Sequence, residues 1–376
     1  MRILVAHAWA LLTDHQHSGD GLFAYALIRR LAERGHELEV ACRAVDLLEP
    51  PPPGITLHRL SEHTDDHMPP RERLAYMRRL RALLGRLDGI ELCWQPNPVD
   101  AGVSLALPAG GPPIVLGPYW ADWPHASTGA GAVVRRALRA AQQRRAAGLL
   151  VSTEAAREKV HADVPVAIVP MGVEPSDFPD PGPRPPGRPP TVIFLANLRA
   201  HKGIFTLLDA FEDVVRRVPD ARLLVAGGGP DGAAVREAAT SSPVAGSIEL
   251  LGPVAREAVP MTLARADVSC QPAHGEPFGW SAVEAMACGL PVVVTDAGGL
   301  GSVVPESAGL KVPPGDADAL AAALAALLGD PARREAMGAA GRVAVEETYA
   351  WERVLDRLEA ALLRAASQSP RDRVPT

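Results

Sequence analysis

The sequence has few cysteines, few aromatic residues and no long hydrophobic run, and these shortages exclude several classes of protein. The four cysteines (Cys42, Cys93, Cys270 and Cys288) lie far apart without metal-ligand spacing, so we expect buried, reduced thiols rather than a disulfide scaffold. No apolar run approaches the ~18 residues of a membrane span. The opening RILVA is too short for a signal peptide. We therefore expect a cytoplasmic protein.

An excess of positive charge is also lacking. Lys and Arg together number 38 against 44 acidic residues, and the net charge of −6 gives no reason to expect a nucleic acid partner. Hydrophobic residues make up 47% of the 376-residue chain, which predicts a globular protein of two or three domains, each with its own core.

Short apolar strands alternate with helical stretches along most of the chain. This alternation is typical of parallel sheets covered by helices on both faces. In the first half we predict strands over residues 2–6, 37–42, 56–60, 91–94, 114–117 and 149–152, and helices over residues 21–34, 70–87, 130–147 and 154–160. In the second half we predict strands over residues 191–196, 222–226, 247–250, 268–271 and 291–295, and helices over residues 203–217, 231–239, 256–265, 279–288, 318–328, 331–347 and 351–366.

Residues 171–190 interrupt the alternation. Their prolines exclude a helix or a central strand, so we interpret this segment as a Pro-rich linker. The predicted fold class is α/β, with two Rossmann-like doubly wound domains facing a central cleft. The first domain covers residues 1–170, the second covers residues 191–350, and residues 351–376 form a C-terminal helix and tail.

The segment QPAHGEPFGWSAVEAMACG, residues 271–289, leaves a strand, turns and enters a helix. Its free backbone N–H groups and the helix dipole favour an anion such as a pyrophosphate, and Ser281 suits the first turn. Glu276 precedes this helix and Glu284 lies 8 residues further on. Each carboxylate can accept hydrogen bonds from a vicinal diol, so the pair suits a sugar at one end and a ribose at the other. A loop acid and a solvated helix acid are the alternative interpretation.

Two further loops follow predicted strands. Arg199 and Lys202 lie in ANLRAHKG, where both cations are placed to neutralise a leaving diphosphate, unless they are isolated surface charges. The loop Gly19-Asp20-Gly21 precedes a helix, and its glycines allow the backbone to approach a ligand closely, unless it is an ordinary turn.

The run from Gly227 to Gly232 matches G-x-G-x-x-G, with Glu249 about 20 residues further on, as in dinucleotide-binding folds. This pattern supports a rival class, the nicotinamide-dependent oxidoreductases. We rank it lower because the pattern lies in the second half of the chain, Pro230 disturbs the loop, and Glu249 does not end its strand.

Taken in order, these segments resemble the retaining glycosyltransferases of family 4, which have the GT-B fold. VPMGVEPSDFP, ANLRAHKG, LLVAGGGP and GEPFGWSAVEAMACGLPVVVTDAGGL match the family pattern in sequence, with Glu276 and Glu284 as its two spaced glutamates. Asn197 departs from it, since Gly or Arg is commoner there. The first half matches more loosely, through RILVA, the Gly19–Gly21 loop and RRLAERGHELEV.

The resemblance implies roles for single residues. Glu284 would hold the ribose hydroxyls of the donor, Glu276 would hold the transferred hexose, and Arg199 and Lys202 would bind the diphosphate. The first domain would bind the acceptor, the second domain would bind the nucleotide sugar, and the closing helix would cross back to the first domain. The donor site would also include Gly19, Gly21, Gly227, Val254, Phe278, Gly279, Trp280 and Ser281.

The resemblance further implies a hexosyltransferase that retains anomeric configuration and needs neither a divalent metal nor a cofactor. The donor would be a UDP-, GDP- or dTDP-sugar, and the acceptor a hydroxyl of a small molecule such as a natural product, an aminocyclitol or a sugar. The alternatives are a membrane-associated transferase acting on lipid or polysaccharide, and a non-catalytic binder of nucleotide sugars.

The acceptor half departs from the family pattern after the strand predicted to end at Gly117. Many members carry a histidine there, whereas this chain reads LGPYWADWPHAS, so Asp122 and His125 are the candidate catalytic substitutes. Trp120, Trp123 and Trp280 are candidates for stacking on a sugar or an acceptor ring, with packing in the core as the alternative. Arginines over residues 71–86 and 135–145 would suit an anionic lipid surface, although a solvated helix face is the alternative.

Overall fold

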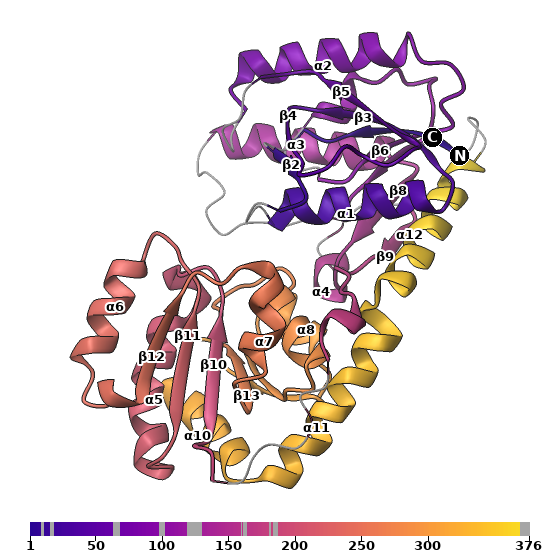
Figure 1. Ribbon diagram of the computed structural model, residues 1–376. Helices are drawn as coiled ribbons and strands as arrows, with labels where there is room; N and C mark the ends of the chain where they lie inside the picture. The colour runs from indigo at the N-terminus through magenta and orange to yellow at the C-terminus, as the bar shows by residue number, and fades with distance from the viewer. Residues whose placement is uncertain are drawn as a thin grey trace. The chain divides into compact units, whose positions relative to one another are not determined.

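The computed structural model describes residues 1–8, 11–15, 19–62, 68–97, 102–118, 130–158, 160, 164–179, 182 and 187–368 (Figure 1). The chain divides into two compact units. The first contains residues 1–170 and 354–376, and the second contains residues 171–353.

Among the described residues, the first unit holds a seven-stranded parallel sheet in the order β5-β3-β1-β6-β7-β8-β9. The inner strand β1 is flanked by β3 and β6, and its residues Ile3 to Ala6 are apolar and buried because the strand is covered on both faces. These strands are β1 (Arg2–Ala6), β3 (Glu37–Cys42), β5 (Ile55–Arg59), β6 (Leu92–Gln95), β7 (Ile114–Leu116), β8 (Gly148–Val151) and β9 (Val166–Ile168).

Helices connect the strands of the first unit, and a second, two-stranded sheet accompanies the main one. Tyr76 and Leu80 of α2 pack with Leu4 and Ala6 of β1 in one core cluster, so α2 covers one face of the main sheet. The helices are α1 (Gly19–Glu33), α2 (Pro70–Leu84), α3 (Ala130–Arg145) and α4 (Glu154–Arg157), and the small sheet pairs β2 (Leu11–Thr13) with β4 (Ala44–Asp46).

The second unit contains a six-stranded parallel sheet in the order β12-β11-β10-β13-β14-β15. Alternate residues of β10 enter the two clusters on its faces: Ile193 packs with α7 and α8, whereas Phe194 packs with α5 and α10. The strands are β10 (Thr191–Leu195), β11 (Arg222–Ala226), β12 (Ile248–Gly252), β13 (Val268–Gln271), β14 (Val292–Thr295) and β15 (Gly309–Val312). The helices are α5 (Ile204–Arg217), α6 (Gly232–Ser241), α7 (Val259–Leu263), α8 (Trp280–Ala287), α9 (Leu300–Val303), α10 (Ala317–Leu328) and α11 (Pro331–Ala344).

The last helix, α12 (Trp351–Ala366), begins in the second unit and ends in the first. In the first unit its Glu359 pairs with Arg34 at 2.8 Å and with His36 at 2.9 Å. At its start, Trp351 N–H donates to the Val173 carbonyl at 3.1 Å, and Val173 also bridges to Ala350. Residues 171–179, which the sequence suggested as part of a linker, are therefore paired within the second unit.

All predicted strands are present, with ends that differ by at most two residues. The short strands β2, β4, β9 and β15 and the helix α9 were not predicted. Two helix predictions were wrong in detail. Pro260 fits only the first turn of a helix, so residues 256–265 form the 3₁₀ turn Arg256–Ala258 and then α7. The helix over 331–347 ends as an α-helix at Ala344 and continues as one π-turn, Val345–Tyr349.

The four cysteines are buried with free thiols, as expected. Burial raises the pKa of Cys42 to about 11 and that of Cys93 to about 12. These thiols are therefore inert packing residues rather than nucleophiles.

His7 follows β1 and is fully buried, and neither of its ring nitrogens has a hydrogen-bond partner among the described residues. Burial, and secondarily the Arg43 cation, lower the pKa of His7 to about 4 from 6.5. Between pH 6.5 and 4, His7 is therefore protonated in the unfolded chain but neutral in the folded protein. We expect stability to fall between pH 6.5 and 4, and His7→Leu to reduce that loss by up to ~3 kcal/mol. Urea unfolding at several pH values measures the free energy of unfolding of both proteins. If His7→Leu loses as much stability between pH 6.5 and 4 as the wild type does, His7 is not the group responsible.

Candidate functional site

The carboxyl edge of the second sheet brings three of the predicted site residues into one region. β10 and β13 are neighbours in the sheet, while the chain runs from β10 to β11 and β12 on one side and from β13 to β14 and β15 on the other. Ligands of open α/β sheets bind where the strand order reverses in this way. The loop after β10 carries Arg199 and Lys202, and the loop after β13 carries Glu276, so both border this point.

Lys202 and Glu276 form an ion pair between these two loops, with the Lys202 ammonium donating to a Glu276 carboxylate oxygen. Both side chains are mostly buried, at 20% and 17% exposure. The loops are also joined through backbone, since His274 N–H donates to the His201 carbonyl at 2.9 Å. Gly203 has φ +78°, and a Cβ there would overlap the Pro272 carbonyl, so only glycine lets the loops approach this closely.

The main chain of Glu276 is fixed independently of its side chain. The N–H groups of Gly299 and Leu300 donate to its carbonyl at 2.9 and 3.2 Å. Three residues later Gly279 forms the N-cap of α8 without a side-chain cap, and the positive end of the helix dipole at this start favours an anion. Ser281 lies in this first turn, as the sequence suggested, while the Phe278 ring packs edge-on against Tyr349 in the core.

Glu284 lies on α8, one helical turn after Trp280, and is 7% exposed. Burial raises the pKa of Glu284 to about 7, and the neighbouring Arg256 guanidinium opposes that rise. Arg256 Nη1 donates to Glu284 Oε1 at 3.4 Å, and its guanidinium carbon lies 4.5 Å from the centre of the Trp280 ring. Sequence reasoning missed Arg256, which lies in the 3₁₀ turn after β12, because no motif spacing relates it to Trp280 or Glu284.

The glycine run after β11 closes against the Lys202 loop. Gly227 N–H donates to the Gly252 carbonyl at 2.8 Å. Its φ is +141°, and a Cβ there would overlap the Ala196 carbonyl, so the position requires glycine. Leu198 N–H donates to the Gly228 carbonyl at 2.8 Å. Close packing of two loops therefore accounts for these glycines. Val254, after β12, packs against the core beside α8, and Arg199 is exposed at the loop.

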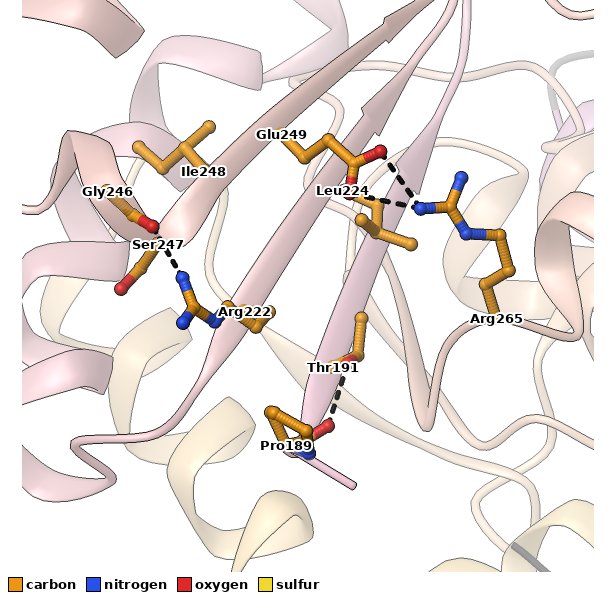
Figure 2. A pocket seen from close by; sticks show the side chains of 9 residues that line it. All are labelled: Pro189, Thr191, Arg222, Leu224, Gly246, Ser247, Ile248, Glu249 and Arg265. Atoms are coloured by element: carbon orange, nitrogen blue, oxygen red, sulfur yellow. Dashed lines mark hydrogen bonds and ion pairs between the residues drawn. The ribbon is translucent and has the colours of Figure 1, made fainter. Parts of the chain in front are cut away.

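A pocket of about 380 Å³ lies at the opposite, amino-terminal edge of the same sheet (Figure 2). It borders the first residues of β10, β11 and β12, and Arg265 pairs across it with Glu249 at 2.9 Å. Glu249 is thus far along its strand from the glycine run, so it cannot hold a ribose beside that loop. This placement removes the basis of the oxidoreductase interpretation.

In the first unit, α1 begins at Gly19, so Gly19 and Gly21 lie in its first turn rather than in a loop. Asp122 and His125, the candidates for a catalytic role in the acceptor half, lie outside the described residues, as do Trp120 and Trp123.

Two parallel α/β units, the second with charged loops at its carboxyl edge, define the class of protein. Residues 179–344 match the family of glycosyl transferases group 1, and residues 18–177 match glycosyltransferase family 4. The chain belongs to these glycosyltransferases and has the GT-B fold. A sucrose-phosphate synthase from Thermosynechococcus elongatus has the same fold, with a TM-score of 0.79, 23% identity, and coverage of 96% of this chain and 98% of that one.

Two curated relatives are more similar in sequence. A GDP-mannose-dependent monoacylated alpha-(1-6)-phosphatidylinositol monomannoside mannosyltransferase of Corynebacterium glutamicum is 37% identical over 176 residues, 45% of this chain and 46% of that protein. A D-inositol 3-phosphate glycosyltransferase of Segniliparus rotundus is 34% identical over 187 residues, 48% of this chain and 41% of that protein. The chain thus spans less than half the length of either relative. In the described part of the chain, no helix has the length and apolar character that crossing a bilayer requires.

Proposed function

We propose that this protein is a retaining glycosyltransferase that transfers a hexose from a nucleotide-diphosphate sugar to an acceptor hydroxyl. The observation that carries the proposal is the arrangement around the start of α8. The Lys202–Glu276 ion pair lies before the helix, the helix begins after Gly279 without a side-chain cap, and the buried Glu284 lies further along it. A sugar, a diphosphate and a ribose follow one another in a donor molecule in that same order.

In the proposed reaction the bond between the sugar's anomeric carbon and the diphosphate oxygen breaks, and a bond from that carbon to the acceptor oxygen forms on the same face. The acceptor proton passes to the departing phosphate oxygen. Lys202 and Arg199 neutralise the charge that develops on the diphosphate, which is the role a divalent metal has in other transferases. Glu276 accepts hydrogen bonds from hexose hydroxyls and, through its ion pair, holds Lys202 in place.

For the acceptor, we propose a hydroxyl on a small polyol, cyclitol or sugar ring. The names of the two curated relatives both include an inositol group, which favours a cyclitol within that range. The name of the first relative also makes a GDP-hexose the first donor to test.

A lipid-linked acceptor at a membrane surface is the second candidate, because the name of the first relative contains phosphatidylinositol. The arginines proposed for a lipid surface give it limited support. Arg79 donates to the Leu60 carbonyl at 2.6 Å, and Arg145 donates to the Leu105 and Leu107 carbonyls at 3.1 and 2.8 Å. These contacts hold the two guanidinium groups to the first unit, although the Arg79 side chain is still 54% exposed.

A nucleotide panel tests the donor half of the proposal. Thermal denaturation is measured with UDP, GDP, dTDP, ADP and NAD, each with and without EDTA. A ligand at 100 times its Kd stabilises the folded state by about 2.7 kcal/mol, so a clear rise in Tm is expected for one nucleoside diphosphate, unchanged by EDTA. A rise in Tm with NAD alone, or no rise in Tm with any of the nucleotides, would refute the donor assignment.

The acceptor half is tested with the donor so identified. Release of nucleoside diphosphate is followed with myo-inositol, inositol phosphate, sugars, and phosphatidylinositol in vesicles. We expect turnover with a water-soluble ring acceptor. Turnover confined to the vesicles would replace that acceptor with the lipid-linked one.

A further inference from the structure

Arg256 touches both of the α8 side chains that border the proposed ribose position. It comes from the 3₁₀ turn after β12, outside the loops that carry Lys202 and Glu276. Trp280 and Glu284 are four residues apart on α8 and so lie on one face of the helix. The Arg256 guanidinium lies over the Trp280 ring and donates to Glu284 Oε1.

We infer that Arg256 is a positioning residue, which holds the Glu284 carboxylate oriented and ionised for the ribose diol of the donor nucleotide. This inference rests on the proposed function and deepens its donor site. The Arg256 side chain is 42% exposed and the Glu284 side chain is 9% exposed, so the arginine approaches the carboxylate from the solvent side. The contact involves one carboxylate oxygen, Oε1. A carboxylate has about four acceptor positions, which leaves room for two ribose hydroxyls beside the arginine.

The ionisation of Glu284 depends on this contact. Its neighbours in the sequence of α8, Ala282, Val283, Ala285 and Met286, are all buried as well, so this part of the helix lies inside the unit. Arg256 is the charged neighbour whose attraction opposes the burial that raises the pKa of Glu284. Without that cation, the neutral acid would prevail at neutral pH, and a neutral acid accepts hydrogen bonds from hydroxyls less strongly than a carboxylate does. Stacking on Trp280 fixes the guanidinium in the geometry that this role requires.

The test compares each nucleotide with its own 2′,3′-dideoxy form. Calorimetry gives the affinities of the full chain for GDP and 2′,3′-dideoxy-GDP from pH 6 to 9, or for the base that the thermal panel selects. The diphosphate titrates in both ligands, so the ratio of the two affinities isolates the diol. In the wild type this ratio should rise through about pH 7, the pKa of Glu284.

In Arg256→Gln the rise should move upward in pH by about one unit, which is a loss of about fivefold in the ratio at pH 7 that nearly disappears at pH 9. Arg256→Lys should restore part of the ratio, because it keeps the charge. Dideoxy-GDP should bind both variants as it binds the wild type. Arg265→Gln is the matched control, since Arg265 is 47% exposed and is also paired with a glutamate, Glu249, at the far edge of the sheet.

A ratio that Arg256→Gln leaves unchanged, or lowers equally at every pH, would overturn the inference, since a packing role alone has no pH signature. If the wild type binds GDP and its dideoxy form equally at all pH values, Glu284 does not hold the ribose and the inference also fails. If it binds no nucleoside diphosphate, the proposed function itself fails first, which is a separate result.

Discussion

Lys202→Ala is expected to lower kcat by about 10²- to 10³-fold, the usual effect of removing one group that stabilises developing charge. Lys202 is the mostly buried cation at the point where the strand order of the second sheet reverses, and its partner Glu276 comes from the facing loop. The loop itself should keep its shape, because backbone hydrogen bonds and Gly203 hold it, not the lysine side chain. Steady-state rates with the identified donor, together with the Tm, measure both effects.

Two further variants test whether the loss of activity comes from the missing Lys202 cation itself. One removes a lysine elsewhere, and the other also removes the charge of Glu276. Lys311→Ala removes an exposed lysine from β15 of the same unit and should leave kcat unchanged. In Lys202→Ala the partly buried Glu276 also loses its partner, and its bare charge would repel the diphosphate. The double variant Lys202→Ala/Glu276→Gln removes that charge, and we expect it to remain inactive because both side chains act on the donor. Near-normal turnover in Lys202→Ala, or recovery in the double variant, would show that the donor lies elsewhere.

The fold could be predicted from the sequence because its strands are buried on both faces. RILVA and TVIFL are apolar after their first residue and lie between segments with clear ends, and such runs admit few alternatives. The short strands β2, β4, β9 and β15 were missed because they do not stand out in the sequence as apolar runs between two helices. The pairing of β2 with β4, for example, depends on where the main sheet brings residues 11 and 44 together.

The site could be predicted only in part. The order of the loops, the proximity of Lys202 to Glu276 and the helix start at α8 follow from motifs at the ends of parallel strands. Arg256 could not be found in this way, because its contacts with Trp280 and Glu284 join two segments 24 and 28 residues apart, and no spacing rule relates them. The same applies to His7, whose burial depends on the packing around β1 and not on its neighbours in sequence.

Glu284→Gln should make the protein more stable as it weakens donor binding. The pKa of Glu284 is about 7 in the folded state, against 4.5 for a glutamate in an unfolded chain, so between these pH values the folded protein holds a proton that the unfolded chain has released. Stability therefore falls as pH rises from 4.5 to 7 and stays lower above it. Glutamine removes this cost, which is up to ~3 kcal/mol.

The gain in Tm should therefore be near zero at pH 4.5 and about 6–12 °C at pH 8, taking 2–4 °C per kcal/mol for a unit of this size. At pH 8 the variant should bind GDP about 10- to 100-fold more weakly than the wild type does. This is the usual loss when hydrogen bonds to a charged group are weakened. Its affinity for 2′,3′-dideoxy-GDP should not change. If Glu284 served only in packing, Glu284→Gln would raise the stability of the protein and leave its affinity for GDP unchanged. A gain in stability together with a loss of GDP affinity would show that Glu284 destabilises the fold and serves ligand binding. Equal GDP affinities of the variant and the wild type would show that Glu284 is not part of the donor site.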